Sequence, residues 1–215
     1  MIRQPDKPAT PKNAEATRSR ILDAALDVFA VKGYHEATVD EIVEQSTTSK
    51  GSVYFHFPNK QALFLALVDK FADLLERRIV EAIAEQPVGI AQVQAALQAC
   101  LDTFGKYRRL AKVMLVQAVG LGAVFEDKRL QVNNRFVLLI KGYIEQAVAV
   151  GDVPPVDAEI AARAWMGAIY ELVIRWVYTG EPTSERILQT LLPMLLRSIG
   201  YDTPLSLNTE LSSNQ

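Results

Sequence analysis

The chain has 215 residues, of which 49% are hydrophobic and 22% are charged, and its formal net charge is −2. This is the composition of an ordinary soluble globular protein, long enough for one large domain or for a small and a medium one. No apolar run approaches the ~18–20 residues that span a bilayer, so we expect no membrane partner. The slightly acidic total excludes a general cationic coat for nucleic acid but leaves room for a local positive surface.

The start of the chain and its single cysteine indicate where the protein works. Residues 1–15 have several prolines, no apolar core and no periodicity, so we predict a flexible arm and no secretory signal. Such an arm either reaches DNA or has no role. Cys100 cannot form an internal disulfide, which is expected of a protein in the reducing cytoplasm. Its thiol is either a small buried hydrophobe or a redox sensor.

The first helix is predicted from Thr17 to Lys32, because apolar residues recur there at helical spacing. Gly33 ends this helix, since glycine adopts the left-handed backbone that follows a helix C-terminus. Arg18 and Arg20 lie in the first turns of the helix. They are candidates for a local positive surface.

The densest pattern of the chain is Thr38–Lys60, TVDEIVEQSTTSKGSVYFHFPNK. Thr38 precedes Glu41 by three residues, the spacing of a capping box that begins a helix. A run of small hydroxyl residues follows and favours a turn. A second short helix is predicted from about Ser49 to Phe55, with Val53 pointing inward. Its other side chains are small, polar or aromatic, as in a helix that enters the major groove.

This stretch resembles the DNA-binding helix-turn-helix of the tetracycline-repressor (TetR) family. The similarity runs from about Thr17 to Phe71 and includes a Gly-Tyr turn and the pattern Tyr-Phe-His-Phe-x-x-Lys. The resemblance implies that a set of residues in the motif contacts DNA. These are Thr38, Thr48, Ser49, Lys50, Gly51, Ser52, Tyr54, Phe55, His56 and Lys60.

The chemistry of these residues supports most of the implied roles. Gly51 lets the helix backbone approach the duplex, and Tyr54 can combine a phosphate hydrogen bond with a contact to a thymine methyl group. Lysine and histidine side chains suit phosphate oxygens. The alternative is that Tyr54 and Phe55 belong partly to the core, and that His56 only caps its helix.

The rest of the chain is predicted to be helical, which makes the fold all-α. Asn59 is expected to cap a long helix that ends near Ala84 and links two parts of the protein. Further helices are predicted at residues 90–104, 107–120, 124–150, 157–178 and 183–199. We therefore expect a flexible arm at 1–15, a three-helix DNA-binding domain at 16–62, a larger helical effector-binding and dimerisation domain at 63–200, and a flexible tail at 201–215.

The larger domain is where the resemblance implies an effector site, because TetR-family proteins bind small, often apolar molecules there. Candidate contacts are the aromatic residues and neighbouring polar groups Phe104, Arg108, Met114, Phe136, Tyr143, Trp165, Tyr170 and Arg175. An arginine in an apolar pocket suits a carboxylate, phosphate or acyl-thioester head group. The alternative is that these residues form an ordinary helical core.

The last two helices have faces too apolar to leave in water. In the TetR family the corresponding helices pair with their symmetry mates in a four-helix bundle. The resemblance thus implies a homodimer with two recognition helices roughly 34–36 Å, or a multiple, apart. Candidate interface residues are Ala164, Ala168, Leu172, Ile187, Leu191 and Leu195. The alternative is that these faces pack only within one chain.

An enzyme is not expected. The two histidines, His35 and His56, lie in or beside the DNA motif, and no histidines or cysteines have the spacing of metal ligands. We predict no catalytic residues, no metal and no cofactor. The sequence predicts a regulator that binds a palindromic DNA operator as a dimer and represses transcription until a small effector releases it. An activator or dual regulator, and a helical small-molecule carrier, remain as alternatives.

Overall fold

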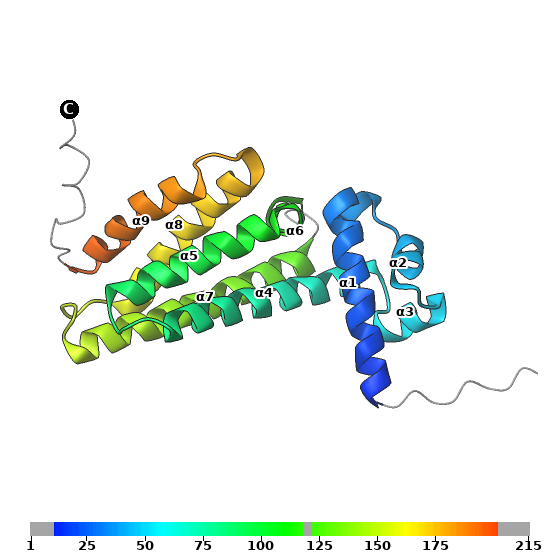
Figure 1. The fold of residues 1–215 in the computed structure, drawn as a ribbon, viewed down its shortest axis with the longest axis horizontal. Helices are drawn as coiled ribbons and strands as arrows, with labels where there is room; N and C mark the ends of the chain where they lie inside the picture. The colour runs from blue at the N-terminus through cyan, green and yellow to red at the C-terminus, as the bar shows by residue number, and fades with distance from the viewer. Residues whose placement is uncertain (1–10, 118–121, 202–215) are drawn as a thin grey trace, which may run out of the picture. The chain divides into compact units, whose positions relative to one another are not determined.

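A computed structural model describes residues 11–117 and 122–201 of the chain. Most of the arm expected at 1–15 and nearly all of the tail expected at 201–215 lie outside these residues. Within the described ranges the chain is helical and contains no β-strand, which confirms the predicted all-α fold (Figure 1).

The helices divide into two compact units. The first contains α1 (Pro11–Glu36), α2 (Val39–Ser46), α3 (Lys50–His56), α4 (Lys60–Ala84) as far as Leu74, α6 (Arg108–Lys112), the π-helical turn η1 (Val113–Gln117) and the start of α7 (Ala123–Val150). The second contains the remainder of α4 and α7 together with α5 (Ile90–Lys106), α8 (Ala158–Thr179) and α9 (Ser184–Ser198).

α1 begins earlier than the apolar pattern indicates, at Pro11 instead of Thr17. A proline is well placed in the first turn of a helix, because the N–H that it lacks has no partner inside the helix. Residues 11–15, assigned to the arm from sequence, are therefore helical. α1 is kinked where its end was predicted, and a short helical segment continues from there to Glu36: Gly33 has φ 79° and ψ 176°, a conformation that is essentially restricted to glycine.

The start of each motif helix follows the capping rules read from the sequence. The Glu41 N–H donates to Thr38 Oγ1 at 3.3 Å, and the Thr38 N–H donates to Glu41 Oε2 at 3.1 Å, which confirms the capping box. Ser49 caps α3 by accepting from the Ser52 N–H at 3.1 Å. Asn59 Oδ1 accepts from the Ala62 N–H at 2.8 Å, so Asn59 caps α4 as predicted.

The core of the first unit joins the N-terminal helices to a distant segment of the chain. Phe29 of α1 and Phe64 of α4 meet with ring centroids 5.3 Å apart, and Tyr34 lies 5.0 Å from Phe64. Phe125 of α7 completes this aromatic group at 5.4 Å from Tyr34. Val113 of η1 is buried in the same core. Residues of η1 and of the start of α7 thus help to hold the N-terminal helices together.

This distant segment differs from its predicted form. A single helix was expected over residues 107–120, but the described part of it is α6 followed by η1. In η1 the backbone hydrogen bonds pass from the α-helical to the π-helical pattern, a local change that side-chain periodicity does not reveal. The prediction of one regular helix was therefore wrong. Residues 118–120 lie outside the described part.

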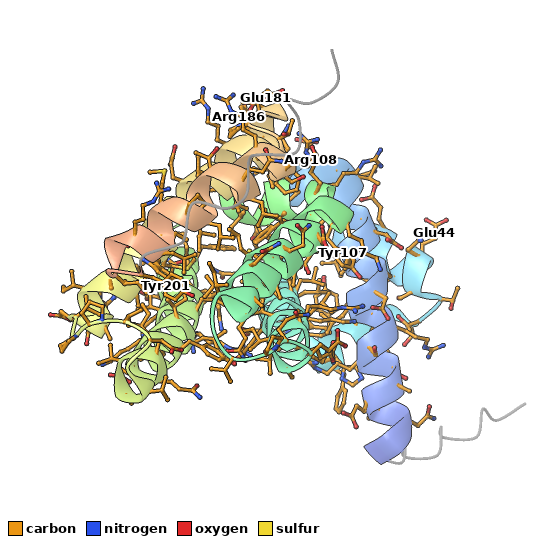
Figure 2. All side chains as sticks on the ribbon, turned by 60° about the vertical axis from the view of Figure 1, so that its left-hand side comes forward. Glu44, Tyr107, Arg108, Glu181, Arg186 and Tyr201 are labelled. Atoms are coloured by element: carbon orange, nitrogen blue, oxygen red, sulfur yellow. The ribbon has the colours of Figure 1, made fainter. Side chains whose placement is uncertain are left out.

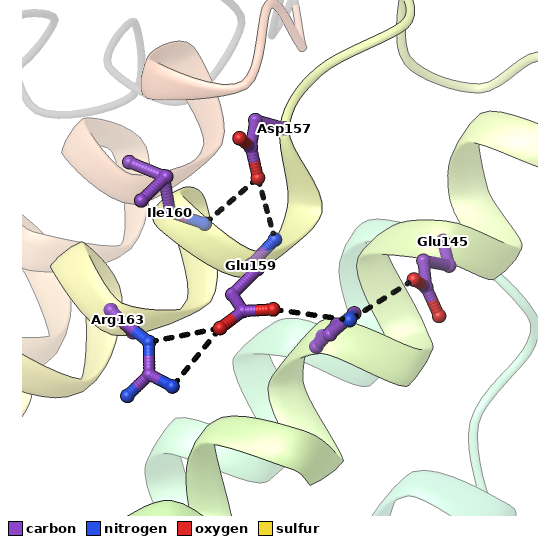
Figure 3. A network of polar contacts seen from close by, with 6 residues as sticks. Glu145, Asp157, Glu159, Ile160 and Arg163 are labelled. Carbon is purple, nitrogen blue, oxygen red and sulfur yellow. Dashed lines mark hydrogen bonds and ion pairs between the residues drawn. The ribbon is translucent and has the colours of Figure 1, made fainter.

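The second unit is built around α5, α8 and α9, which lie side by side (Figure 1). Asp157 caps α8: its Oδ1 accepts from the Glu159 and Ile160 N–H groups, both at 3.1 Å. Glu159 in turn accepts from Arg163 at 3.0 Å and pairs with Lys141 of α7 at 3.4 Å (Figure 3). These contacts fix the start of α8 against α7.

Candidate nucleic-acid interface

α2 and α3 are joined by a tight turn whose central residue has an uncommon backbone. Thr47 has φ 51° and ψ 38°, the left-handed region that a β-branched residue seldom adopts. Its N–H continues the end of α2 by donating to the Glu44 carbonyl at 3.1 Å. Beside it, Ser46 Oγ and Thr48 Oγ1 are 2.8 Å apart, and Ser46 is buried. The turn therefore sets the direction of α3.

α3 has one face in the core and one face in solvent. Val53 is buried and so is Phe57, the residue that follows the helix, as the sequence predicted. Tyr54 is 44% exposed and Phe55 is 81% exposed. The alternative that Phe55 belongs to the core is therefore excluded. At Gly51 an added Cβ would meet only Ser49 Oγ, at 4.0 Å, so the backbone of α3 is open to close approach.

The cation at the start of α3 is paired with an acidic residue of α2. Lys50 Nζ lies 2.6 Å from Asp40 Oδ1, and both side chains are more than half exposed. This hydrogen bond raises the pKa of Lys50 above its ordinary value. A second lysine, Lys32, forms an ion pair with Glu41 and holds the pKa of that carboxyl below its ordinary value. Glu44 extends from α2 into solvent (Figure 2).

Lys60 serves the fold of the motif directly. Its Nζ donates to the backbone carbonyls of Tyr34, His35 and Ala37 at 2.9, 3.1 and 3.0 Å. The ammonium also lies 4.7 Å from the centroid of the Tyr34 ring. An ammonium has three protons, so these carbonyls account for all of its donors. Lys60 thereby ties the start of α4 to the connection between α1 and α2.

Arg18 stands beside the end of α3, although the site residues inferred from sequence did not include it. Its guanidinium carbon is 5.2 Å from the centroid of the Phe57 ring, a cation–π contact between α1 and the residue that follows α3. The side chain is exposed. His56, also expected at DNA, is half-buried between Phe55 and Phe57, with ring centroids 5.1 and 6.3 Å away.

Comparisons with known proteins agree with this geometry. A family model described as bacterial regulatory proteins of the tetR family matches residues 21–67. Over 165 residues the chain is 28% identical to the HTH-type transcriptional regulator SrpR of Pseudomonas putida, covering 76% of each protein. It is 24% identical to the fatty acid metabolism regulator protein of Bacillus subtilis over 160 residues, 74% of this chain and 82% of that protein. Residues 21–67 thus form a DNA-binding domain of the TetR type.

The fold of the chain is shared with solved regulators. The crystal structure of FadR from Bacillus subtilis in complex with stearoyl-CoA matches with a TM-score of 0.73 at 22% identity, covering 84% of this chain and 98% of that one. The protein is accordingly a DNA-binding, helix-turn-helix regulator of transcription. The resemblance noted in the motif is confirmed.

The residues expected at the effector site are divided between the two compact units. Arg108 and Met114 belong to the first unit, and Arg108 follows Tyr107 at the start of α6 (Figure 2). The others belong to the second unit, where Phe104, Phe136 and Trp165 are buried and Tyr143, Tyr170 and Arg175 are half-buried or exposed. Trp165 Nε1 donates to Ser198 Oγ at 2.9 Å.

Cys100 is buried on α5, and burial raises the pKa of its thiol to about 12. The thiolate is the reactive form of cysteine, so this environment leaves the thiol unreactive at neutral pH. The side chain acts as a small hydrophobe of the second unit. This argues against the redox-sensor alternative.

The expected dimer residues also fall into two groups. Ala164 is exposed on α8, with Ala168 and Leu172 half-buried. On α9 the side chains of Ile187, Leu191 and Leu195 are buried within the single chain. These three therefore contribute to the core of the second unit. Two exposed hydrophobic side chains outside the expected set, Ile160 of α8 and Met194 of α9, remain available on the surface.

The part of the chain that the structure describes contains neither a candidate metal site nor a candidate membrane-spanning helix. Within residues 11–117 and 122–201, no group of three or more histidine, cysteine, aspartate and glutamate residues is arranged to hold a metal ion. No helix in that part of the chain has the length and apolar character needed to cross a membrane.

Proposed function

We propose that this protein binds a palindromic operator as a homodimer, with α3 in the major groove, and that it represses transcription until a small effector releases it. The observation that carries the proposal is the outward face of α3. Phe55 is 81% exposed, Tyr54 is 44% exposed, and the Gly51 backbone is open to close approach. The match of residues 21–67 to a family of bacterial regulators supports the same role. We place its action in the cytoplasm, where its DNA target lies.

The proposed DNA contacts are the motif residues whose side chains or backbone face outward. Lys50 binds a phosphate by exchanging its exposed partner Asp40 for a phosphate oxygen. Tyr54 reaches a base edge or a phosphate, and Gly51 allows the approach. Thr38 and Ser49 bring the first turns of their helices to the backbone, and the set is completed by Thr48, Ser52, Phe55 and His56. Lys60 supports these contacts by fixing the connection before α2.

The proposed dimer uses the exposed part of α8. Ala164, Ala168 and Leu172 provide small and apolar side chains that let two helices approach closely, and the exposed Ile160 extends this surface. Met194 contributes from α9. A two-fold axis would place two copies of α3 roughly 34–36 Å apart, which is one turn of DNA, or a multiple of this spacing.

The proposed effector is a partly apolar molecule with an anionic group. The similar Bacillus subtilis regulator was crystallised with stearoyl-CoA, a ligand of this chemistry. In this chain the candidate aromatic residues and the arginines Arg108 and Arg175 supply apolar surface and positive charge. Release requires that the effector bind the DNA-free state more tightly than the DNA-bound state. α4 is the element proposed to carry the change, because it has residues in both units.

Selection from a random duplex library with the purified protein tests the proposal. We expect an enriched palindrome whose affinity falls steeply with salt, because phosphate contacts release counterions. The double variant Lys50→Ala, Tyr54→Ala is the matched control and should enrich no sequence. If the wild-type protein also enriches none, the proposed function is wrong. A reporter gene under the selected operator then separates repression from activation by the sign of its response.

A further inference from the structure

Phe55 is the most exposed of the large hydrophobic side chains among the described residues, at 81%. A phenylalanine exposed to this degree gains nothing from the core of its own chain. It lies between Val53 and Phe57 in the sequence, and both of these side chains are buried. The exposure of this ring therefore follows from its position on α3.

The surroundings of Phe55 leave one side of its ring free. Gly51 is four residues earlier, on the same face of α3, and side chains of a helix lean toward the preceding turn. Gly51 has no side chain, and a Cβ built there would meet only Ser49 Oγ, at 4.0 Å, so this part of the face presents open backbone beside Phe55. On another side the ring meets His56 edge to face, with centroids 5.1 Å apart. The ring thus has one aromatic neighbour, and most of its surface is open to solvent.

The chemistry of phenylalanine restricts what such a ring can recognise in DNA. It has no hydrogen-bond donor or acceptor, whereas every base edge in the major groove presents at least one of the two. Placed against guanine, cytosine or adenine, the ring would remove polar atoms from water without replacing their hydrogen bonds, which is unfavourable. The 5-methyl group of thymine is the one apolar group in the major groove. Burial of that methyl group against the ring is favourable.

We infer that Phe55 determines part of the sequence specificity of α3 by packing against the 5-methyl group of a thymine, one in each half-site of the operator. This inference rests on the proposed function, since it requires α3 to lie in the major groove. It assigns Phe55 a role distinct from that of Tyr54, whose hydroxyl can also donate to phosphate. It predicts a T at a fixed position of each half-site.

Replacement of single thymines by deoxyuridine tests the inference, because deoxyuridine pairs as thymine does and lacks only the methyl group. In the selected operator, each half-site should contain one thymine whose replacement by deoxyuridine lowers wild-type affinity by about four-fold. This is the effect expected from no longer burying one methyl-sized group. Replacement in both half-sites should lower it by about fifteen-fold. Phe55→Ala should bind the thymine and deoxyuridine operators equally, whereas Tyr54→Phe should still distinguish them.

The outcomes separate the inference from the function on which it rests. Thermal unfolding of Phe55→Ala should match that of the wild-type protein, because the side chain is exposed. If an operator is enriched but no deoxyuridine replacement affects affinity, the inference is wrong and the proposed function stands. The inference is equally wrong if Phe55→Ala loses as much affinity on replacement as the wild type. If no operator is enriched at all, the proposed function itself fails.

Discussion

α3 and α9 are both short helices with one apolar face, yet they place their large side chains differently. α9 buries Ile187 and Leu191 in the second unit. α3 buries Val53 in the first unit but leaves Tyr54 and Phe55 in solvent. Packing within one chain accounts for the apolar residues of α9. It does not account for the aromatic residues of α3, which therefore indicate a partner outside the chain.

The largest effect that follows from this comparison concerns the stability of the second unit. Leu191→Ala should lower the free energy of unfolding by about 2–5 kcal/mol, the usual cost of a cavity at a buried leucine. Phe55→Ala is the matched variant at an exposed position and should change it by less than ~0.5 kcal/mol. Chemical denaturation measures both. If Leu191→Ala disrupts a dimer without changing the unfolding of the chain, Leu191 lies in an interface instead of the core and the comparison fails.

The next effect concerns DNA affinity and tests whether α3 is the helix that contacts DNA. Tyr54→Ala and Lys50→Ala should each weaken operator binding by ~1–3 kcal/mol without unfolding the protein. The loss in Lys50→Ala should be similar for all sequences and should reduce the dependence of affinity on salt, because this residue contacts phosphate. Fluorescence anisotropy over a range of salt concentrations measures both effects. Unchanged affinity in both variants would contradict the proposed contacts.

A smaller effect concerns the turn that directs α3. Thr47→Gly should raise the free energy of unfolding by about 0.5–1 kcal/mol, because a left-handed backbone costs a side-chain-bearing residue ~1–2 kcal/mol and glycine recovers most of it. Thr47→Ala retains a Cβ and should gain much less. Thermal unfolding of the three proteins checks the order. A glycine variant less stable than the wild type would show that Thr47 is not strained.

The smallest effect concerns the ion pair between α2 and α3. Asp40→Asn should strengthen DNA binding by roughly two- to five-fold, because Lys50 loses a competing partner and the interface loses a negative charge. The gain should shrink as salt increases. Asp102→Asn, a change of the same charge in the second unit, is the control and should leave affinity unaltered. If both variants gain affinity equally, the gain comes from the change in net charge and not from the release of Lys50.

What could be predicted from sequence was local. The capping box of Thr38 and Glu41 and the cap supplied by Asn59 each link residues three positions apart, so the spacing of residue types identified them. The inward position of Val53 followed from helical periodicity in the same way. These features fixed the motif and, through its resemblance to a family, the class of function.

What could not be predicted depends on contacts between residues far apart in the chain. Lys60 was expected at DNA, but its ammonium is bound by carbonyls about 25 residues earlier, such as that of His35. Arg18 reaches Phe57 only because α1 and α3 pack together. The apolar face of α9 was visible in the sequence, but periodicity does not distinguish a neighbour in the same chain from one in a second chain. Burial of Leu191 in the structure assigns its side chain to the core.

Hydrogen exchange of the backbone amides, with and without the selected operator, tests most directly whether the exposed face of α3 binds DNA. In the bound protein we predict slower exchange across Lys50–His56, because contact with the duplex removes the open states of α3. The unbound protein under the same conditions is the reference. If exchange in α3 is the same in both samples while the operator is demonstrably bound, recognition lies elsewhere on the protein.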